Sequence, residues 1–283
     1  MARGKALKEN AYRILASVPL LRRFFAPDLP ASRPPPSPDQ RLRLEIVSHC
    51  WRYDRLLTYQ LSSLALAPPR EVEVRITVFH SQEDEPTVEA LHYFQAQGIP
   101  GVEVNPWPLD RGRLFRRAIG RNLAARQTEA DWIWFTDCDI LFGEGALDRL
   151  GREVRDRQDF LVFPRTHMCS PLLPGNDPIF RDRKDLPGIL TLDTDGFEPE
   201  TRDRAVGGFQ IVRSDVARAA GYCGNISFYQ EPVASWQKSY EDRTFRWLLG
   251  TQGTPVEVDG FYRIRHQAKG RKGKVPGRSK DRG

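Results

Sequence analysis

The stretch DWIWFTDCD, residues 131–139, decides the fold class of this chain. Its apolar part, residues 132–135, has the length and the aromatic and β-branched character of a buried strand. The strand delivers two carboxylates, Asp137 and Asp139, at its C-terminal end. Ligands of open α/β sheets bind beyond the carboxyl ends of the strands, and carboxylate oxygens suit hard divalent cations. On this spacing alone, turn or helix-capping roles for the two aspartates remain equally open.

Strand and helix patterns alternate on both sides of this stretch. Before it, strands are predicted at 42–47, 72–79 and 102–104, and helices at 55–67, 88–97 and 113–127. After it, strands are predicted at 159–164, 207–212 and 255–266, and helices at 213–220 and 240–249. This alternation predicts an α/β fold with a mainly parallel central sheet flanked by helices. Residues 164–205 show little periodicity, and irregular segments of that length are usually functional or mobile.

Positive charge is concentrated at the two ends of the chain. Residues 1–25 carry a net charge of +5 and residues 265–283 carry +7, so with a total of +6 the body between them is −6. A negative body argues against a nucleic-acid-binding protein, which would present a basic face on its fold. We divide the chain into an N-terminal basic and amphipathic segment (1–30), a Pro-rich linker (31–40), one α/β domain (41–266) and a basic flexible tail (267–283).

The sequence predicts a cytoplasmic protein. No stretch approaches the roughly 20 apolar residues of a membrane-spanning helix. The N-terminal segment is short and interrupted by Pro19, and it either lies along a membrane surface or packs on the domain. The four cysteines form no C-x-x-C pair, and their spacings fit neither a zinc site nor a dense disulfide framework. Cys138, placed between two acidic residues, favours a reducing compartment.

Four segments, in a fixed order, resemble family 2 glycosyltransferases, which have the GT-A fold. They are GRNLAA (120–125), WIWFTDCD (132–139), GGFQIVR (207–213) followed by AGY (220–222), and YEDRTFRWL (240–248). The resemblance covers residues 42–266. It implies a metal-dependent transfer of a sugar from a nucleotide-sugar donor, with a UDP-sugar as the default, to a hydroxyl of a saccharide or other acceptor, with inversion.

The resemblance also implies which residues carry the chemistry. Asp139 would hold Mn²⁺ or Mg²⁺, with Asp137 sharing the metal site or lying nearer the ribose, and the late His266 would complete the site. The ion would neutralise the leaving diphosphate. Asp242 would be the general base that takes the acceptor's proton, with Glu241 positioning the acceptor or its loop. For His266 a plain surface position remains the alternative, and for Asp242 an ordinary acidic first turn of a helix.

Three further residues are expected to face the donor. Gly207 and Gly208 would let the backbone approach the sugar because no Cβ intervenes, unless they form an ordinary β-turn or a bulge. Arg121 either reaches the diphosphate or lies on a solvated helix face.

The nucleotide pocket departs from the family pattern at two strand ends. The first strand ends in Ser48 and His49, before Trp51, instead of the usual Pro-x-Tyr/Phe-Asn. The second strand lacks the usual acidic residue after Phe79. We therefore expect Trp51 or Phe79 to stack on the base, with Ser48 and His49 in the pocket, and the identity of the base stays open.

Two other functions compete with glycosyl transfer. A nucleotidyltransferase also uses paired acids and Mg²⁺, but residues 48–54 contain no Gly-rich, basic phosphate loop. The other is a degenerate glycosyltransferase-like domain that binds or scaffolds without catalysis. The altered nucleotide pocket favours that alternative, and the intact acidic residues argue against it.

Overall fold

The computed structural model describes residues 19–33, 37, 40–181, 186–236 and 239–267. Most of the N-terminal basic segment, half of the Pro-rich linker and nearly all of the basic tail lie outside the described residues, so the predictions for them stay predictions. Within the described part of the chain, no helix has the length and apolar character that crossing a bilayer requires. All four cysteines fall in the described part, and each is free and buried.

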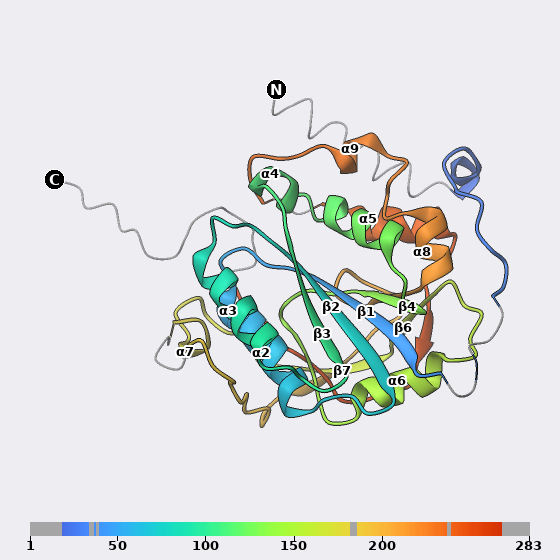
Figure 1. The fold of residues 1–283 in the computed structure, drawn as a ribbon. Helices are drawn as coiled ribbons and strands as arrows, with labels where there is room; N and C mark the ends of the chain where they lie inside the picture. The colour runs from blue at the N-terminus through green and yellow to red at the C-terminus, as the bar shows by residue number, and fades with distance from the viewer. Residues whose placement is uncertain (1–18, 34–36, 38–39, 182–185, 237–238, 268–283) are drawn as a thin grey trace.

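A seven-stranded sheet forms the centre of the domain (Figure 1). Its larger part is parallel, in the order β3 (Val102–Pro108), β2 (Val72–His80), β1 (Leu42–His49) and β4 (Trp132–Phe135). β1, β2 and β4 are mostly buried because helices cover both faces of the sheet, whereas the edge strand β3 is largely half-buried. The prediction of an α/β fold with a mainly parallel central sheet is confirmed.

Among the remaining strands of this sheet, one runs opposite to the rest. β9 (Gln210–Arg213) runs antiparallel to β4 on one side and to β6 (Leu161–Pro164) on the other. β10 (Thr254–Val256) completes the edge, parallel to β6. The start of β9 therefore lies beside the C-terminal end of β4, where Phe135 is paired with Gln210.

Helices lie on both faces of the sheet (Figure 1). α2 (Asp54–Leu66) and α3 (Glu85–Ala96) pack together on one face, and α5 (Arg117–Gln127) packs with α8 (Ser214–Ala220) on the other. The remaining helical elements are η1 (Pro19–Phe24), α4 (Arg111–Leu114), α6 (Ala146–Val154), α7 (Pro178–Arg181), α9 (Ser227–Gln230) and α10 (Glu241–Leu249).

The helix predicted over 113–127 is divided into α4 and α5. The side chain of Asp110 caps α4 by accepting the N–H of Arg113 at 3.0 Å. The chain then leaves the helical path at Arg116, and α5 begins at Arg117. This break points the start of α5 toward the C-terminal end of β4.

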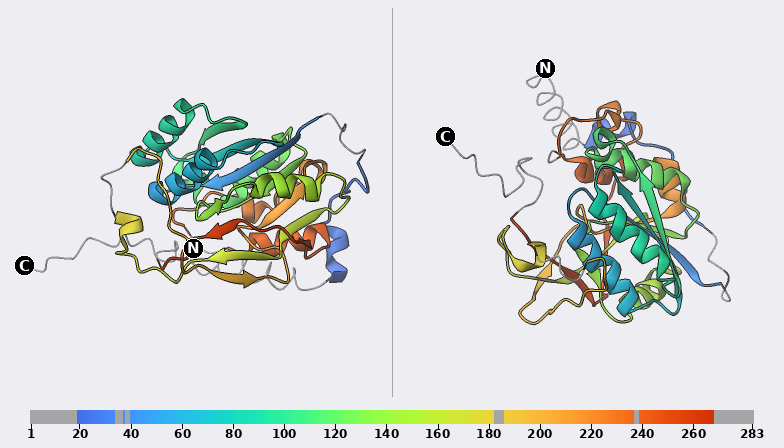
Figure 2. Two further views of the ribbon diagram at one scale, coloured as in Figure 1. Left: turned by 90° about the horizontal axis from the view of Figure 1, so that it is seen from below. Right: turned by 60° about the vertical axis from the view of Figure 1, so that its left-hand side comes forward.

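A second, four-stranded sheet was not predicted from the sequence. Its order is β5 (Ile140–Phe142), β11 (Phe261–Arg263), β7 (Thr166–Cys169) and β8 (Glu198–Thr201). The left view in Figure 2 shows it as a layer beside the main sheet. Two of its strands come from the segment expected to be irregular, and the region predicted as one strand at 255–266 is divided between the two sheets.

An aromatic cluster joins the two sheets. Trp134, in the middle of β4, is completely buried. Its ring meets Phe142 of β5 edge-on at 5.5 Å and Phe261 of β11 at 5.0 Å between ring centroids. Large aromatic side chains contribute much apolar area to a core. The turn from β4 to β5, which carries Asp137 and Asp139, is therefore anchored at both ends.

Candidate active site

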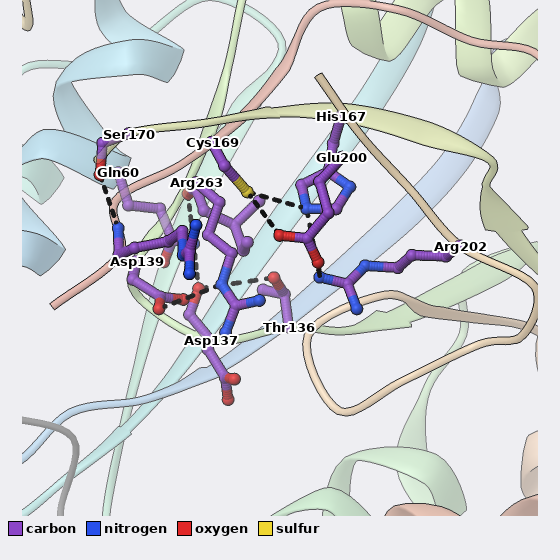
Figure 3. Close-up of polar contacts among 12 residues, drawn as sticks. Gln60, Thr136, Asp137, Asp139, His167, Cys169, Ser170, Glu200, Arg202 and Arg263 are labelled. Carbon is purple, nitrogen blue, oxygen red and sulfur yellow. Dashed lines mark hydrogen bonds and ion pairs between the residues drawn. The ribbon is translucent and has the colours of Figure 1, made fainter. Parts of the chain in front are cut away.

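Gln60 of α2 fixes the turn that carries the two aspartates. Its buried amide nitrogen donates to the carbonyl oxygens of Asp137 at 3.0 Å and Ile140 at 2.9 Å. Its amide oxygen accepts the hydroxyl hydrogen of Ser48 at 2.8 Å. Figure 3 shows Gln60 beside Asp137 and Asp139. Ser48, expected in the donor pocket, is fully buried and orients Gln60.

Arg117 links Asp137 to the start of α10. Its guanidinium lies 2.9 Å from Asp137 Oδ1 and 3.3 Å from Glu241 Oε1. The Glu241 side chain is only 1% exposed, whereas Arg117 and Asp137 are 27% and 29% exposed. Burial by itself lowers the pKa of Arg117, but Asp137 and Glu241 outweigh it and raise that pKa above its ordinary value. The guanidinium is therefore charged, and it joins two segments more than a hundred residues apart.

Arg121, one turn after Arg117 on α5, is completely buried. It donates to the hydroxyl of Tyr222 and the carbonyl of Gly207, both at 2.9 Å, and to the carbonyl of Thr136 at 3.2 Å. It also lies 3.5 Å from Asp137 Oδ1. The alternative that Arg121 occupies a solvated helix face is wrong, because its guanidinium is buried and hydrogen-bonded to three separate segments around Asp137.

Gly207 and Gly208 form a β-turn against Asp137. The turn is closed by the N–H of Phe209, which donates to the carbonyl of Val206 at 2.7 Å. A Cβ on Gly208 would lie 3.5 Å from Asp137 Oδ2, whereas a Cβ on Gly207 would meet no atom within 4 Å. The expected β-turn is present, and it leaves room beside the Asp137 carboxylate.

Asp139 is bound to the second sheet. Its Oδ2 lies 3.5 Å from Nε of Arg263, and its carbonyl accepts the N–H of Ile264 at 2.9 Å. Arg263 of β11 thus neutralises the more buried of the two aspartates. Figure 3 shows this pair next to Asp137.

His266 is buried, so the alternative of a plain surface position is wrong. Its ring packs against Tyr53 and Phe180, each at 5.4 Å between centroids. Asp137, Asp139 and His266 do not come together as three ligands: among the described residues, the one group of three ligand atoms within 4.8 Å of one another is His167, Cys169 and Glu200. The predicted set of two aspartates and His266 is therefore not assembled here.

Asp242 is the more accessible acid at the start of α10. Its side chain is 29% exposed, and its Oδ2 lies 3.7 Å from Arg246 one turn later. Gln210 of β9 donates to the Asp242 carbonyl at 3.3 Å, which fixes this helix end beside the strand. Of the acidic pair, Glu241 holds Arg117 inside the protein and Asp242 can be reached from solvent.

The aromatic candidates for the nucleotide pocket differ in exposure. Phe79 is fully buried between His49 and Trp107, at 5.0 and 5.1 Å between centroids, so it has no open face for a base. Trp51 is partly exposed and meets Phe115 edge-on at 5.4 Å. Burial, and then Arg121 and Arg117, hold the pKa of His49 well below its ordinary value, which leaves the buried ring neutral.

Three residues of this site were missed from the sequence. Arg117 precedes Arg121 by four residues, a spacing that puts both on one helix face and could have revealed it. Gln60 and Arg263 gave no such signal, because each reaches the turn after β4 from another element.

No protein-family model matches the sequence, and neither does any curated protein. Among solved structures, TarS 1-349 from S. aureus is similar, with a TM-score of 0.46 and 14% identity over 79% of this chain and 60% of that one. The same protein in complex with UDP-GlcNAc has a TM-score of 0.44 and 12% identity, over 81% of this chain and 60% of that one. Mannosyltransferase PcManGT from Pyrobaculum calidifontis, in complex with GDP-Man and Mn²⁺, has a TM-score of 0.47 and 15% identity, over 92% of this chain and 68% of that one. The chain spans 60% of the TarS fragment, and since these TM-scores lie below 0.5, the case for a function rests on the site.

Proposed function

We propose that this chain is a glycosyltransferase with a GT-A fold that moves a sugar from a nucleotide-sugar donor to an acceptor hydroxyl. One observation carries the proposal: Arg117 bridges Asp137, at the end of β4, and Glu241, at the start of α10. The Gly207-Gly208 turn and Arg121 meet at the same carboxylate. α5, the Gly207-Gly208 turn and, through Arg117, the start of α10 therefore meet at Asp137, beyond the C-terminal end of β4, where α/β proteins bind ligands.

The chemistry of the two aspartates fits a divalent metal ion. Asp137 and Asp139 offer hard carboxylate oxygens, which Mn²⁺ and Mg²⁺ accept. An ion held there would supply charge neutralisation for the nucleoside diphosphate as it leaves. Arg117 is placed to bind the same diphosphate, because its guanidinium is partly exposed beside Asp137. We leave His266 outside the ligand set because its ring packs on Tyr53 and Phe180.

Asp242 is our candidate for the general base. In an inverting displacement the acceptor oxygen bonds to the anomeric carbon, the bond from that carbon to the diphosphate breaks, and the hydroxyl proton passes to the base. Asp242 is the exposed member of the acidic pair, whereas Glu241 is closed off by burial and by Arg117. Glu241 then acts as a positioning residue that holds Arg117 toward the donor.

Release of nucleotide from a panel of UDP-, GDP- and dTDP-sugars, with Mn²⁺ or with EDTA, tests this function. We expect release from one donor, dependent on Mn²⁺ and lost in Asp139→Asn. UDP remains the default nucleotide of the donor, and the acceptor is a saccharide or another molecule with a hydroxyl group. Absence of release together with nucleotide binding would favour the alternative of a binding module without catalysis.

The role of the base needs a matched control, which α8 provides. Asp215 also lies in the first turn of a helix and pairs with a nearby arginine, Arg213, at 2.7 Å. We expect Asp242→Asn to lower transfer at least about 100-fold, in the range for loss of a general base. Asp215→Asn should leave transfer nearly unchanged. Equal effects of the two substitutions would remove Asp242 from this role.

A further inference from the structure

Three side chains that differ in chemistry meet between β7 and β8. His167 and Cys169 stand two residues apart on β7 and share one face of the strand. Glu200 of β8 is directly opposite His167 in the antiparallel register. Cys169 Sγ lies 3.3 Å from His167 Nε2 and 3.2 Å from Glu200 Oε2. Figure 3 shows the three side chains pointing toward one another.

Two of the spacings among these atoms match a tetrahedral metal site, and all three ligand atoms lie within 4.8 Å of one another. For Zn²⁺ with its ordinary bond lengths to sulfur, nitrogen and oxygen, neighbouring ligand atoms lie about 3.5 Å apart. The two distances from Cys169 Sγ come within a few tenths of an ångström of that value. We propose that His167, Cys169 and Glu200 bind Zn²⁺ or a chemically similar divalent cation, at a site separate from Asp137 and Asp139. This inference stands independently of the proposed function.

Arg202 already places a positive charge at this position. Its Nη2 donates to Glu200 Oε1 at 2.6 Å and lies 3.3 Å from His167 Nε2. Because a guanidinium can only donate, Nε2 of His167 presents its lone pair to the cluster, as a metal ligand must. Burial, and then Arg202, lower the pKa of His167 to about 4, so the ring is neutral near pH 7.

Metal binding at this cluster has a defined balance of protons and charge. The Cys169 thiol gives its proton to solvent as the sulfur–metal bond forms. Arg202 leaves Glu200, and since its side chain is 13% exposed, it has a path to solvent. The dication then takes over the charge compensation of the Glu200 carboxylate.

The position of the site indicates what a bound cation would stabilise. Among the described strands, β8 pairs only with β7, and three of its four residues are exposed. Such an edge strand buries little apolar surface of its own. Arg263, which pairs with Asp139, follows on the neighbouring strand β11 and lies in the electrostatic range of Cys169. A cation bound between β7 and β8 would stabilise the pairing of this edge strand next to the candidate active site.

Cysteine spacing, from which zinc sites are usually predicted, does not reveal this site. Only one cysteine takes part, and Glu200 comes from 31 residues further along the chain. The strand pairing supplies the third ligand, which linear spacing cannot show.

Cobalt substitution in the 283-residue chain tests the proposal. After removal of metals with EDTA, titration with Co²⁺ should give a thiolate-to-cobalt charge-transfer band at one ion per chain. Zn²⁺ should abolish the band and Mg²⁺ should not, because thiolate ligands prefer the softer ion. Cys169→Ser should remove the band, whereas Cys50→Ser, a matched change at another buried cysteine, should keep it.

Two further variants should change the Co²⁺ affinity in opposite directions, and this test does not depend on whether Cys169→Ser folds. Glu200→Gln should weaken the binding of Co²⁺ at least about tenfold, because a charged ligand is lost. Arg202→Gln should tighten it, because a competing charge is removed. The proposal is overturned if the native chain shows no band, if the band survives Cys169→Ser, or if Arg202→Gln fails to tighten binding. Each readout is independent of donor turnover, so failure here leaves the proposed function standing.

Discussion

Substitution of Arg117 by glutamine tests the charge arrangement of the site most sharply. Glu241 is 1% exposed, and the ion pair that the structure gives its carboxylate is with Arg117, at 3.3 Å. Without the guanidinium, the fold would hold a buried carboxylate that has lost this ion pair. Asp137 would lose its ion pair of 2.9 Å with Arg117 as well, although it is partly exposed.

The size of the effect follows from these exposures. Removing one partner of a buried ion pair costs about 3–5 kcal/mol of unfolding free energy, whereas an exposed pair contributes about 0–1 kcal/mol. Because Arg117 is 27% exposed, we expect the lower end, about 3 kcal/mol. Arg152→Gln is the matched control, since Arg152 pairs with Glu71 at 2.6 Å with both side chains more than half exposed. It should cost less than about 1 kcal/mol.

Urea denaturation at neutral pH measures both variants, with the slope of the transition as a check that the unfolded state is unchanged. The double variant Arg117→Gln, Glu241→Gln removes the unpaired charge, so we expect it to be more stable than Arg117→Gln alone by about 2 kcal/mol. The reasoning is refuted if Arg117→Gln costs no more than Arg152→Gln. It is also refuted if the unfolding free energies lost in the single variants Arg117→Gln and Glu241→Gln simply add up to the loss in the double variant.

Three other results are expected. Gln60→Ala takes a buried donor from the carbonyls of Asp137 and Ile140 and should lower the unfolding free energy by about 2–4 kcal/mol in urea. Gly120→Ala would put a Cβ 2.4 Å from His49 Nε2 and should cost at least about 1–3 kcal/mol in thermal unfolding, whereas Gly207→Ala faces open space and should cost little. Burial and Arg202 lower the pKa of His167 to about 4, so in metal-free protein the unfolded state takes up the proton first as pH falls. Stability should therefore decline between pH 6.5 and 4 by up to about 1.4 kcal/mol per pH unit from this residue, and His167→Gln should flatten that slope.

The parallel half of the fold could be predicted because its strands are long and apolar. β1, β2 and β4 bury nearly every residue, and the helices between them carry an apolar face, so local pattern and final position agree. β8 shows the opposite case, because Glu-Pro-Glu-Thr has no strand character. It becomes a strand by pairing with β7, a contact that local sequence does not encode.

Some residues of the candidate site could be predicted from the sequence for a similar reason. Asp137, Gly208 and Glu241 stand out by residue type, and the structure brings their segments together. Arg121 was ambiguous, because an arginine on a helix usually lies in solvent and only the surrounding carbonyls make its burial favourable. The separation of His266 from the aspartates depends on how its segment packs, which the spacing of the three residues does not determine.

Binding of a nucleoside diphosphate to two variants, measured by calorimetry with Mn²⁺ and with EDTA, is the decisive experiment on the turn after β4 as donor site. The account predicts that Asp242→Asn binds the nucleotide as tightly as the native chain while failing to transfer sugar. It predicts that Asp139→Asn loses the part of the affinity that depends on Mn²⁺. Equal Mn²⁺-dependent binding by Asp139→Asn and the native chain would contradict the assignment of this turn as the donor site.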